Sequence, residues 1–320
     1  MAELTRNSSG GTSKIWGHLG ALFVVICWGV SFLSTKVLMG EGGFSPIEVF
    51  VYRFTLAYLV LLAFTFRKIK SDSWADELRF VVCGICSGAI YFITENYALR
   101  YTSTGNVSLL SAVSPIFTTL LMAVVFRQAI KMGTAFGSLI AFAGVACVVF
   151  SHGGSLEFSP KGDLLALSSA LSWAIYSIVV KKIMPRYDSL YITRKMFFYG
   201  TIVAVPLLFI QQQPLHLGEL FSLQEPKYLL NMLFLALMCS LAAFILFNQA
   251  MRILGAVTAN NYIYAQPLVT MIAAYLVFHE EITLLGYIGC ALIIGGLILA
   301  DKWTADFRKR KLNKLQDPEL

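Results

Sequence analysis

Residues Ala256–Glu281 read AVTANNYIYAQPLVTMIAAYLVFHEE, a stretch that combines a membrane-spanning length with polar groups. Its mostly apolar part, Ala256–Phe278, is long enough to cross a bilayer core of about 30 Å as a helix. Its first half nevertheless places Asn260, Tyr264 and Pro267 at positions i, i+4 and i+7 of one helical face. Polar groups in hydrocarbon require partners or a water-filled cavity. We therefore expect this face to look onto protein or water, with the proline loosening the turn before it.

The same design occurs earlier in the chain. The sequence of residues Asn96–Gly144 aligns with that of Asn248–Gly296 at an offset of 152 residues. The first helices of the two halves align at an offset of 145 residues, which pairs Trp28 with Trp173. The chain therefore contains an internal repeat. The identities that carry the longer match include Asn96/Asn248, Ala98/Ala250, Arg100/Arg252, Pro115/Pro267, Thr118/Thr270, Phe126/Phe278, Gly137/Gly289 and Gly144/Gly296.

Composition places the chain in a membrane. Hydrophobic residues make up 57% of it and charged residues 13%, and the mean hydropathy is +0.70. A soluble domain carries about 25% charged residues. All six cysteines lie inside apolar spans, so we expect no disulfide framework, and the C-x-x-C at Cys83 and Cys86 is interpreted as a helix contact. The fold class predicted is an all-α integral membrane protein.

Apolar runs predict ten transmembrane helices as two inverted five-helix repeats around a central cavity. We expect a disordered tail at residues 1–15, a first repeat at 16–151, a connecting loop at 152–161, a second repeat at 162–301 and a basic tail at 302–320. The ten spans fall at about 16–38, 46–66, 78–99, 103–126, 131–151, 162–183, 191–210, 229–250, 255–278 and 283–301.

Basic residues set the orientation. The two tails and the connections on their side carry 20 of the 25 Lys and Arg residues, whereas the opposite side carries 4. Positive charge concentrates on the cytoplasmic side of membrane proteins, so both termini are predicted to be cytoplasmic, in a multi-pass protein of the plasma (inner) membrane. This distribution also explains the net charge of +7 without nucleic-acid binding.

An odd number of spans per repeat inverts the second half relative to the first. Inverted repeats are a common design of secondary transporters, with the substrate site between the halves near the bilayer midplane. The sequence holds no phosphate-binding glycine loop, H-E-x-x-H or G-x-S-x-G motif, so we expect no cofactor, no metal site and no enzymatic activity. Any pumping would use an ion gradient or the gradient of the substrate itself.

Several short motifs occur along the chain, namely Cys27-Trp28-Gly29, Ser31-Phe32, Lys36, Asn96-Tyr97-Ala98-Leu99, Ser114-Pro115, Gln266-Pro267 and Glu280-Glu281-Ile282-Thr283. Together with the ten spans and the paired five-helix halves, they resemble the drug/metabolite transporter superfamily, EamA type, over about residues 16–301. The resemblance implies a ten-helix basket with a central cavity and export of small metabolites such as amino acids. Gln128 departs from the repeat, because the second half has Glu280 at the matching position.

Two ionisable groups lie well inside the spans. Arg53 and Glu95 are both expected in the outer half of the membrane, where they could form a structural pair. Glu95 is our candidate for proton coupling or for contact with a substrate amine, since the second half has Phe247 at the matching position. Arg53 is its expected charge partner, and snorkelling toward the interface is the alternative.

The remaining candidates for substrate binding are aromatic or uncharged hydrogen-bonding groups. Such groups suit a polar or zwitterionic substrate. Packing is the alternative for the aromatic rings, and helix–helix contact is the alternative for the amides. Pro115 and Pro267 are the expected hinges. The candidates are Trp28, Tyr91, Asn96, Ser111, Trp173, Tyr176, Asn248, Asn260, Tyr264 and Gln266.

The sequence thus predicts a secondary active exporter of small polar or amphipathic metabolites such as amino acids. Exchange for a proton stays open, and the oligomeric state is not determined by these patterns. A passive metabolite facilitator is one alternative. An intramembrane lipid-modifying enzyme is another, although it would require a catalytic cluster that the sequence does not show.

Overall fold

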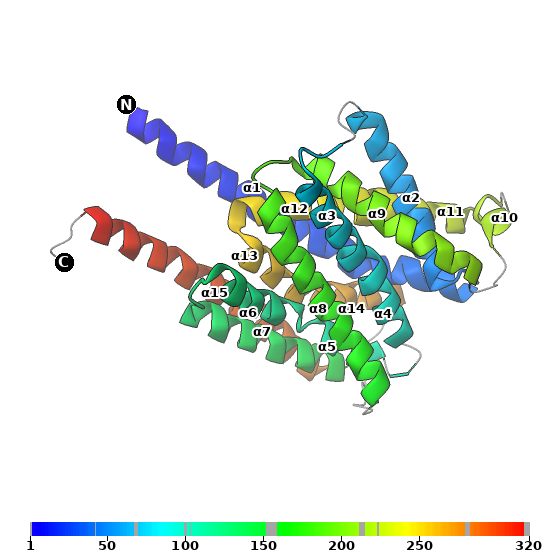
Figure 1. Cartoon of the computed structure of the whole chain (residues 1–320). Coiled ribbons are helices and arrows are strands. Elements are labelled where there is room, and N and C mark those ends of the chain that lie inside the picture. Colours follow the sequence, from blue (N-terminus) through cyan, green and yellow to red (C-terminus); the bar gives the residue numbers. More distant parts are fainter. Residues whose placement is uncertain are drawn as a thin grey trace.

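The computed structural model describes residues 2–41, 43–66, 70–98, 101–102, 104–151, 159–210, 215–222, 224–278 and 282–316. Throughout these residues the regular elements are helices (Figure 1). The first half contains α1 (Ala2–Lys36), η1 (Val37–Glu41), α2 (Pro46–Thr65), α3 (Trp74–Gly84), η2 (Ile85–Ile90), α4 (Tyr91–Ala98), α5 (Thr104–Ser111), α6 (Ser114–Phe126) and α7 (Met132–Ser151). The second half contains α8 (Pro160–Ile183), α9 (Ser189–Ile210), α10 (Leu217–Leu220), α11 (Pro226–Leu233), η3 (Phe234–Ala242), α12 (Ala243–Leu254), α13 (Ala256–Asn261), η4 (Tyr262–Ala265), α14 (Gln266–Phe278) and α15 (Leu284–Gln316).

Short polar signals start several of these helices. Ser45 precedes Pro46 and forms a capping box with Glu48, in which each side chain bonds the other's backbone N–H. Ser73 and Ser159 cap α3 and α8 with their hydroxyls alone, which accept from the backbone N–H groups of Asp76 and Gly162. These caps satisfy backbone donors that would otherwise lie unpaired at helix ends.

Eight continuous helices among the described residues are long and apolar enough to cross a membrane. They account for the first eight predicted spans. The ninth runs through α13, η4 and α14, which follow one another without a gap, and the tenth is the apolar part of α15, Leu284–Ala300. Helix α1 begins at Ala2 and α15 continues to Gln316, so the tails expected outside the repeats extend the first and last helices. Helix propagation costs much less than nucleation, which explains such extensions.

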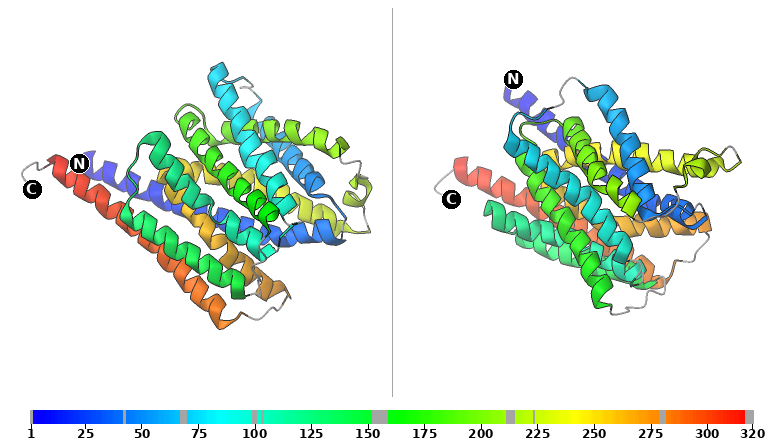
Figure 2. Two further views of the ribbon diagram at one scale, coloured as in Figure 1. Left: turned by 60° about the horizontal axis from the view of Figure 1, so that its bottom comes forward. Right: turned by 45° about the vertical axis from the view of Figure 1, so that its right-hand side comes forward.

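The helix pairing has two-fold symmetry. Helix α1 packs on α12 and α14, and its counterpart α8 packs on α4 and α6. Helix α2 packs on its own counterpart α9, and α7 packs along α15. If each helix is replaced by its counterpart in the other half, the same set of helix pairs results. This is expected for duplicated five-span units. Figure 2 shows α7 (green) and α15 (orange to red) side by side in both views.

Both chain ends lie on one side of the bundle, which we call the termini face (Figure 1). Helix α1 runs from this face to the opposite one, α2 returns, and α3, η2 and α4 cross again. The position of a residue along its helix therefore gives its depth between the termini face and the opposite face. Trp28 and Trp173 lie at intermediate depth, whereas Lys36, Pro46, Asn96 and Val149 lie toward the opposite face.

Candidate functional site

A cavity of about 810 Å³ lies between the two halves. It extends from the level of Trp28 and Trp173 to residues near the opposite face, such as Lys36 and Asn96. Its wall comes from α1, α2, α4, α5, α6, α7, α8, α12 and α14, together with η1 and η4. The central cavity that the repeat predicted is thus present, and it is large enough for a drug-sized or smaller molecule.

Two opposite charges line this cavity without pairing. Arg53 is 5% exposed and donates from Nε to Oγ of Ser240 over 2.8 Å. Glu95 accepts from the Tyr91 hydroxyl at 2.9 Å and from Ser111 at 3.5 Å. The described residues contain no ion pair within 4.0 Å that joins Arg53 to Glu95. The sequence hypothesis of a direct structural pair therefore does not describe this conformation.

Aromatic rings surround the two charges. The Trp28 and Trp173 rings meet edge to face, with centroids 5.3 Å apart. Tyr91 lies 5.5 Å from Trp173, and the Arg53 guanidinium lies 5.3 Å from the centroid of the Phe92 ring. A cation over an aromatic face is stabilised by the ring quadrupole. The cavity is therefore an apolar, aromatic chamber with a few charged and polar groups in defined places.

Seven of the eleven sequence-predicted substrate residues line the cavity, and four lie behind its wall. The seven are Trp28, Tyr91, Glu95, Asn96, Ser111, Trp173 and Gln266. The four are fully buried: Tyr176, Asn248, Asn260 and Tyr264 are each 0% exposed. Contact with substrate stays a prediction for the first group, and for the second group the structure favours a packing role.

Hydrogen bonds explain why three of these four residues are turned inward. Tyr176 donates to Asn248 over 2.7 Å, and Asn248 donates to Thr193 over 3.1 Å. Asn260 accepts from the Trp173 indole at 2.8 Å and donates to the Ala256 carbonyl at 2.8 Å. The amides are thus occupied by protein partners. Asn260 nevertheless affects the cavity, because it orients an indole that lines it.

Both predicted hinge prolines lie just after helix breaks. Helix α5 ends at Ser111 and α6 begins at Ser114, so the fourth span is interrupted before Pro115. In the ninth span, the 3₁₀ turn Tyr262–Ala265 precedes Pro267. Proline removes a backbone donor and disfavours helix at the residue before it, which explains the breaks. Discontinuous spans at matching positions of two repeats are typical of transporter binding sites.

Several cavity residues were not singled out in the sequence. Phe50, Phe92 and Phe244 line the wall, and their apolar side chains are indistinguishable in sequence from lipid-facing ones. Ser240 supports Arg53 from a span that is far away in the chain, so no local pattern could indicate the contact. Lys36 was quoted only as part of a motif, yet it lines the cavity near the opposite face.

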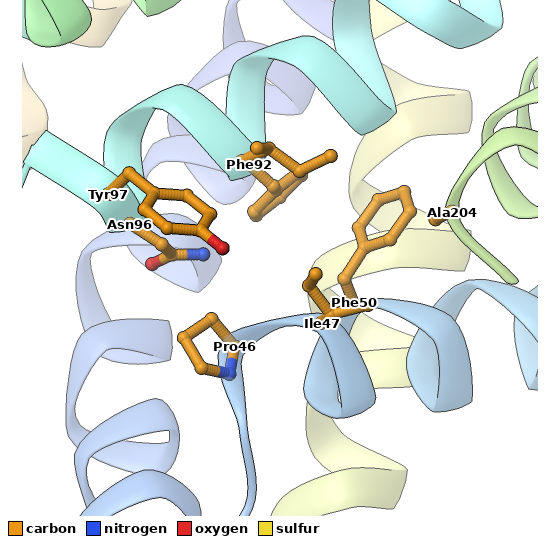
Figure 3. Close-up of a pocket in the computed structure, with 8 residues that line it drawn as sticks. Pro46, Ile47, Phe50, Phe92, Asn96, Tyr97 and Ala204 are labelled. Atoms are coloured by element: carbon orange, nitrogen blue, oxygen red, sulfur yellow. The ribbon is translucent and has the colours of Figure 1, made fainter. Parts of the chain in front are cut away.

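A smaller pocket adjoins the cavity between α2, α4 and α9 (Figure 3). Pro46, Phe50, Phe92 and Asn96 line both spaces, and they separate the pocket from the cavity by a single layer of side chains. Figure 3 shows the Asn96 amide on the α4 side, opposite Pro46. This amide thus lies at the boundary of the two spaces.

Comparison with known proteins supports the transporter reading of this geometry. The profile of the EamA-like transporter family matches residues 15–150 and again residues 160–300. The chain belongs to the EamA-like transporter family. This assignment excludes the alternative of an intramembrane enzyme, and it agrees with a membrane fold made of duplicated helical halves.

Proteins named as transporters align with this EamA-like transporter over most of their length. An uncharacterized transporter of Archaeoglobus fulgidus is 28% identical over 88% of this chain and 96% of its own. A probable terminal-alkyne amino-acid exporter of Streptantibioticus cattleyicolor is 23% identical over 90% of this chain and 94% of its own. A solved crystal structure matches with a TM-score of 0.72 and 19% identity, and covers 93% of this chain and 99% of that one, which supports the fold.

The termini face of this EamA-like transporter is held by a polar network. Asp76 is 0% exposed and accepts from Arg79 and Arg186 at 2.6 Å each and from the Tyr187 hydroxyl at 3.1 Å. Burial, with the Asp76 carboxylate beside it, raises the pKa of Tyr187 to about 12, so the phenol remains a donor at neutral pH. Arg252 also donates to the Tyr187 carbonyl. The network joins α3, the connection of α8 to α9, and α12.

Proposed function

We propose that this protein is a secondary active exporter of small zwitterionic or amphipathic metabolites, of which amino acids are the leading class, working by alternating access. The observation that carries the proposal is the placement of Arg53 and Glu95. Both line one cavity, they have opposite charge, and they do not neutralise each other. Charges inside a membrane protein are costly and mark substrate or ion pathways.

A zwitterion can satisfy both groups at once. Its carboxylate would pair with the Arg53 guanidinium, and its ammonium would meet Glu95, near Tyr91 and Ser111. An opposite charge at about 4 Å gains about 4 kcal/mol at an effective dielectric constant of about 20, before desolvation is subtracted. The aromatic wall formed by Trp28, Trp173 and their neighbours suits an apolar substituent. The similarity to a probable terminal-alkyne amino-acid exporter supports this class.

Direction follows from orientation in this proposal. With both termini in the cytoplasm, as the basic residues predict, the cavity extends from mid-membrane toward the outside. The conformation is then outward-facing, and the termini-face network around Asp76 lies on the closed side. The two-fold helix pairing supplies a second conformation in which the halves exchange roles, which is the basis of alternating access in inverted repeats.

Glu95 also fits a role in proton coupling. A carboxylate that can bind either a proton or a substrate ammonium couples the two, because occupancy by one excludes the other. A passive facilitator is the remaining alternative within the transporter class. It would move substrate equally well without a proton gradient, and it would not require a titratable group at this position.

The test is flux into proteoliposomes, with labelled amino acids screened in the presence and absence of an imposed pH gradient. We expect the gradient to accelerate flux in the wild type and the acceleration to be lost in Glu95→Gln. Glu225→Gln is the matched control, because Glu225 is an exposed carboxylate that lies outside the cavity and pairs with Lys227. Flux that ignores the gradient would favour the facilitator, and full coupling in Glu95→Gln would remove Glu95 from the mechanism. No flux of any amino acid would overturn the substrate class.

A further inference from the structure

The π-helical segment η3 (Phe234–Ala242) holds two cavity residues of the other half of the molecule. The Cys239 carbonyl accepts from the Trp28 indole Nε1 at 2.9 Å. The next residue, Ser240, accepts from Arg53 Nε at 2.8 Å. A π-helical turn contains an extra residue, which changes the register of carbonyls and side chains and is frequent at functional sites. Two adjacent residues of one irregular segment thus fix an indole and a guanidinium in the cavity wall.

Ser240 makes an unusual choice of partner for a buried serine in a membrane helix. Such hydroxyls commonly donate back to a carbonyl of their own helix, as Ser87 does to Cys83 over 2.7 Å in the π-helical segment η2. Ser240 is 0% exposed and accepts instead from a residue of α2. When the offset of 152 residues is extended eight positions before Asn96, Gly88 corresponds to Ser240. The hydroxyl therefore belongs to one half only, as the charge it contacts does.

The contact restricts the plane of the guanidinium. Arginine has five N–H donors in a rigid planar fork, so fixing Nε and stacking the group on rings sets the direction of both Nη atoms. The Arg53 guanidinium lies 5.6 Å from the Phe54 centroid and 5.3 Å from the Phe92 centroid. Within the part of the chain that the structure describes, its two Nη atoms have no hydrogen-bond partner. A carboxylate is the ligand whose two oxygens match such a pair of donors.

We infer that Ser240 is a positioning residue for substrate specificity: it aims the Nη edge of Arg53 into the cavity and thereby selects substrates that carry a carboxylate. The inference rests on the proposed transport function. It adds a buried residue of the second half, which a search for side chains that face the cavity would not identify. Without the Ser240 hydroxyl, the guanidinium would lose its fixed plane while keeping its charge. The transporter would then discriminate less between a substrate with a carboxylate and one with a neutral carboxamide. The contacts to the other groups of the substrate would remain.

Two probes separate this effect from a general loss of function, namely labelled phenylalanine and labelled phenylalaninamide. Both carry an ammonium and an aromatic ring, and only the first carries a carboxylate. We expect Ser240→Ala to raise the KM for phenylalanine about tenfold, the size of one hydrogen bond to a charged group, and to leave the KM for the amide within about twofold. Ser240→Thr keeps the hydroxyl and restores the wild-type ratio. Ser87→Ala, the matched control in η2, leaves both values unchanged.

Arg53→Gln in the same assay distinguishes failure of this inference from failure of the proposed function. If Arg53→Gln abolishes the preference for phenylalanine and Ser240→Ala does not, or if Ser240→Ala affects both probes equally, Ser240 is a packing residue and the inference is overturned. If Arg53→Gln itself leaves the preference intact, or if the wild type carries neither probe, the proposed binding mode is wrong and the inference falls with it.

Discussion

The pairing of α7 with α15 depends on glycines that let the two backbones touch, and neighbouring glycines of α15 test this. A Cβ atom at Gly296 would lie 2.6 Å from both the Ala141 nitrogen and the Gly137 carbonyl oxygen, whereas a Cβ at Gly295 would meet nothing within 4 Å. Both substitutions to alanine gain up to about 1 kcal/mol of helix propensity. Only Gly296→Ala must also push the helices apart, by about 0.8 Å to reach ordinary contact distance, at an overpacking cost of about 1–3 kcal/mol.

Gly295→Ala is therefore expected to be neutral or stabilising, and Gly296→Ala to be net destabilising by up to about 2 kcal/mol. The assay is thermal unfolding of both purified variants, measured side by side in the same detergent. The measured quantity is the fraction of protein that remains monodisperse at each temperature. Because neighbouring membrane helices gain little from the hydrophobic effect, lost backbone contact is not replaced by other burial. Equal stability of the two variants, or a lower stability of Gly295→Ala, would refute the close-packing argument.

Two further perturbations address other parts of the molecule. Asn248→Leu leaves the buried hydroxyls of Tyr176 and Thr193 without their amide partner, and it should lower the free energy of unfolding by about 1–3 kcal/mol. The KM for a transported amino acid should stay nearly unchanged, and a large rise in KM with normal thermal stability would return Asn248 to the substrate site. Asp76→Asn removes the anion shared by Arg186 and Tyr187, so hydrogen–deuterium exchange in the α8–α9 connection should increase, and unchanged exchange there would contradict a closing role for the network.

The position of the cavity could be predicted from the sequence at the level of spans and halves. The repeat and the odd number of spans predicted a cavity between the halves, and the prolines of the fourth and ninth spans predicted where helices would break. These inferences succeed because they depend on backbone chemistry, which is local. A proline that follows a polar cluster, at matching positions of the two halves, disturbs its helix regardless of what the rest of the chain does.

The same reasoning could not separate residues that face the cavity from residues behind its wall. Asn260 and Gln266 lie on one polar stretch, and both need hydrogen-bond partners inside a membrane. Gln266 lines the cavity, whereas Asn260 is occupied by Trp173 and by its own helix. Helical spacing shows that a polar side chain avoids lipid. It does not show whether its partner is protein or substrate, because that depends on contacts between spans that are distant in sequence.

The asymmetry of the charges bears on how a two-fold scaffold can transport in one direction. The charged residues that line the cavity, Lys36, Arg53 and Glu95, all come from the first half, while the second half has Phe247 where the first has Glu95. If the halves exchange conformations during transport, as we propose, a two-fold rotation relates the scaffold of the second state to that of the first, but it does not relate their charged groups. Substrate affinity then differs between the two states, and so does the affinity of Glu95 for a proton. By linkage, a proton that binds one state more tightly shifts the populations of both, so an imposed gradient drives net flux on a scaffold that has no directional preference of its own.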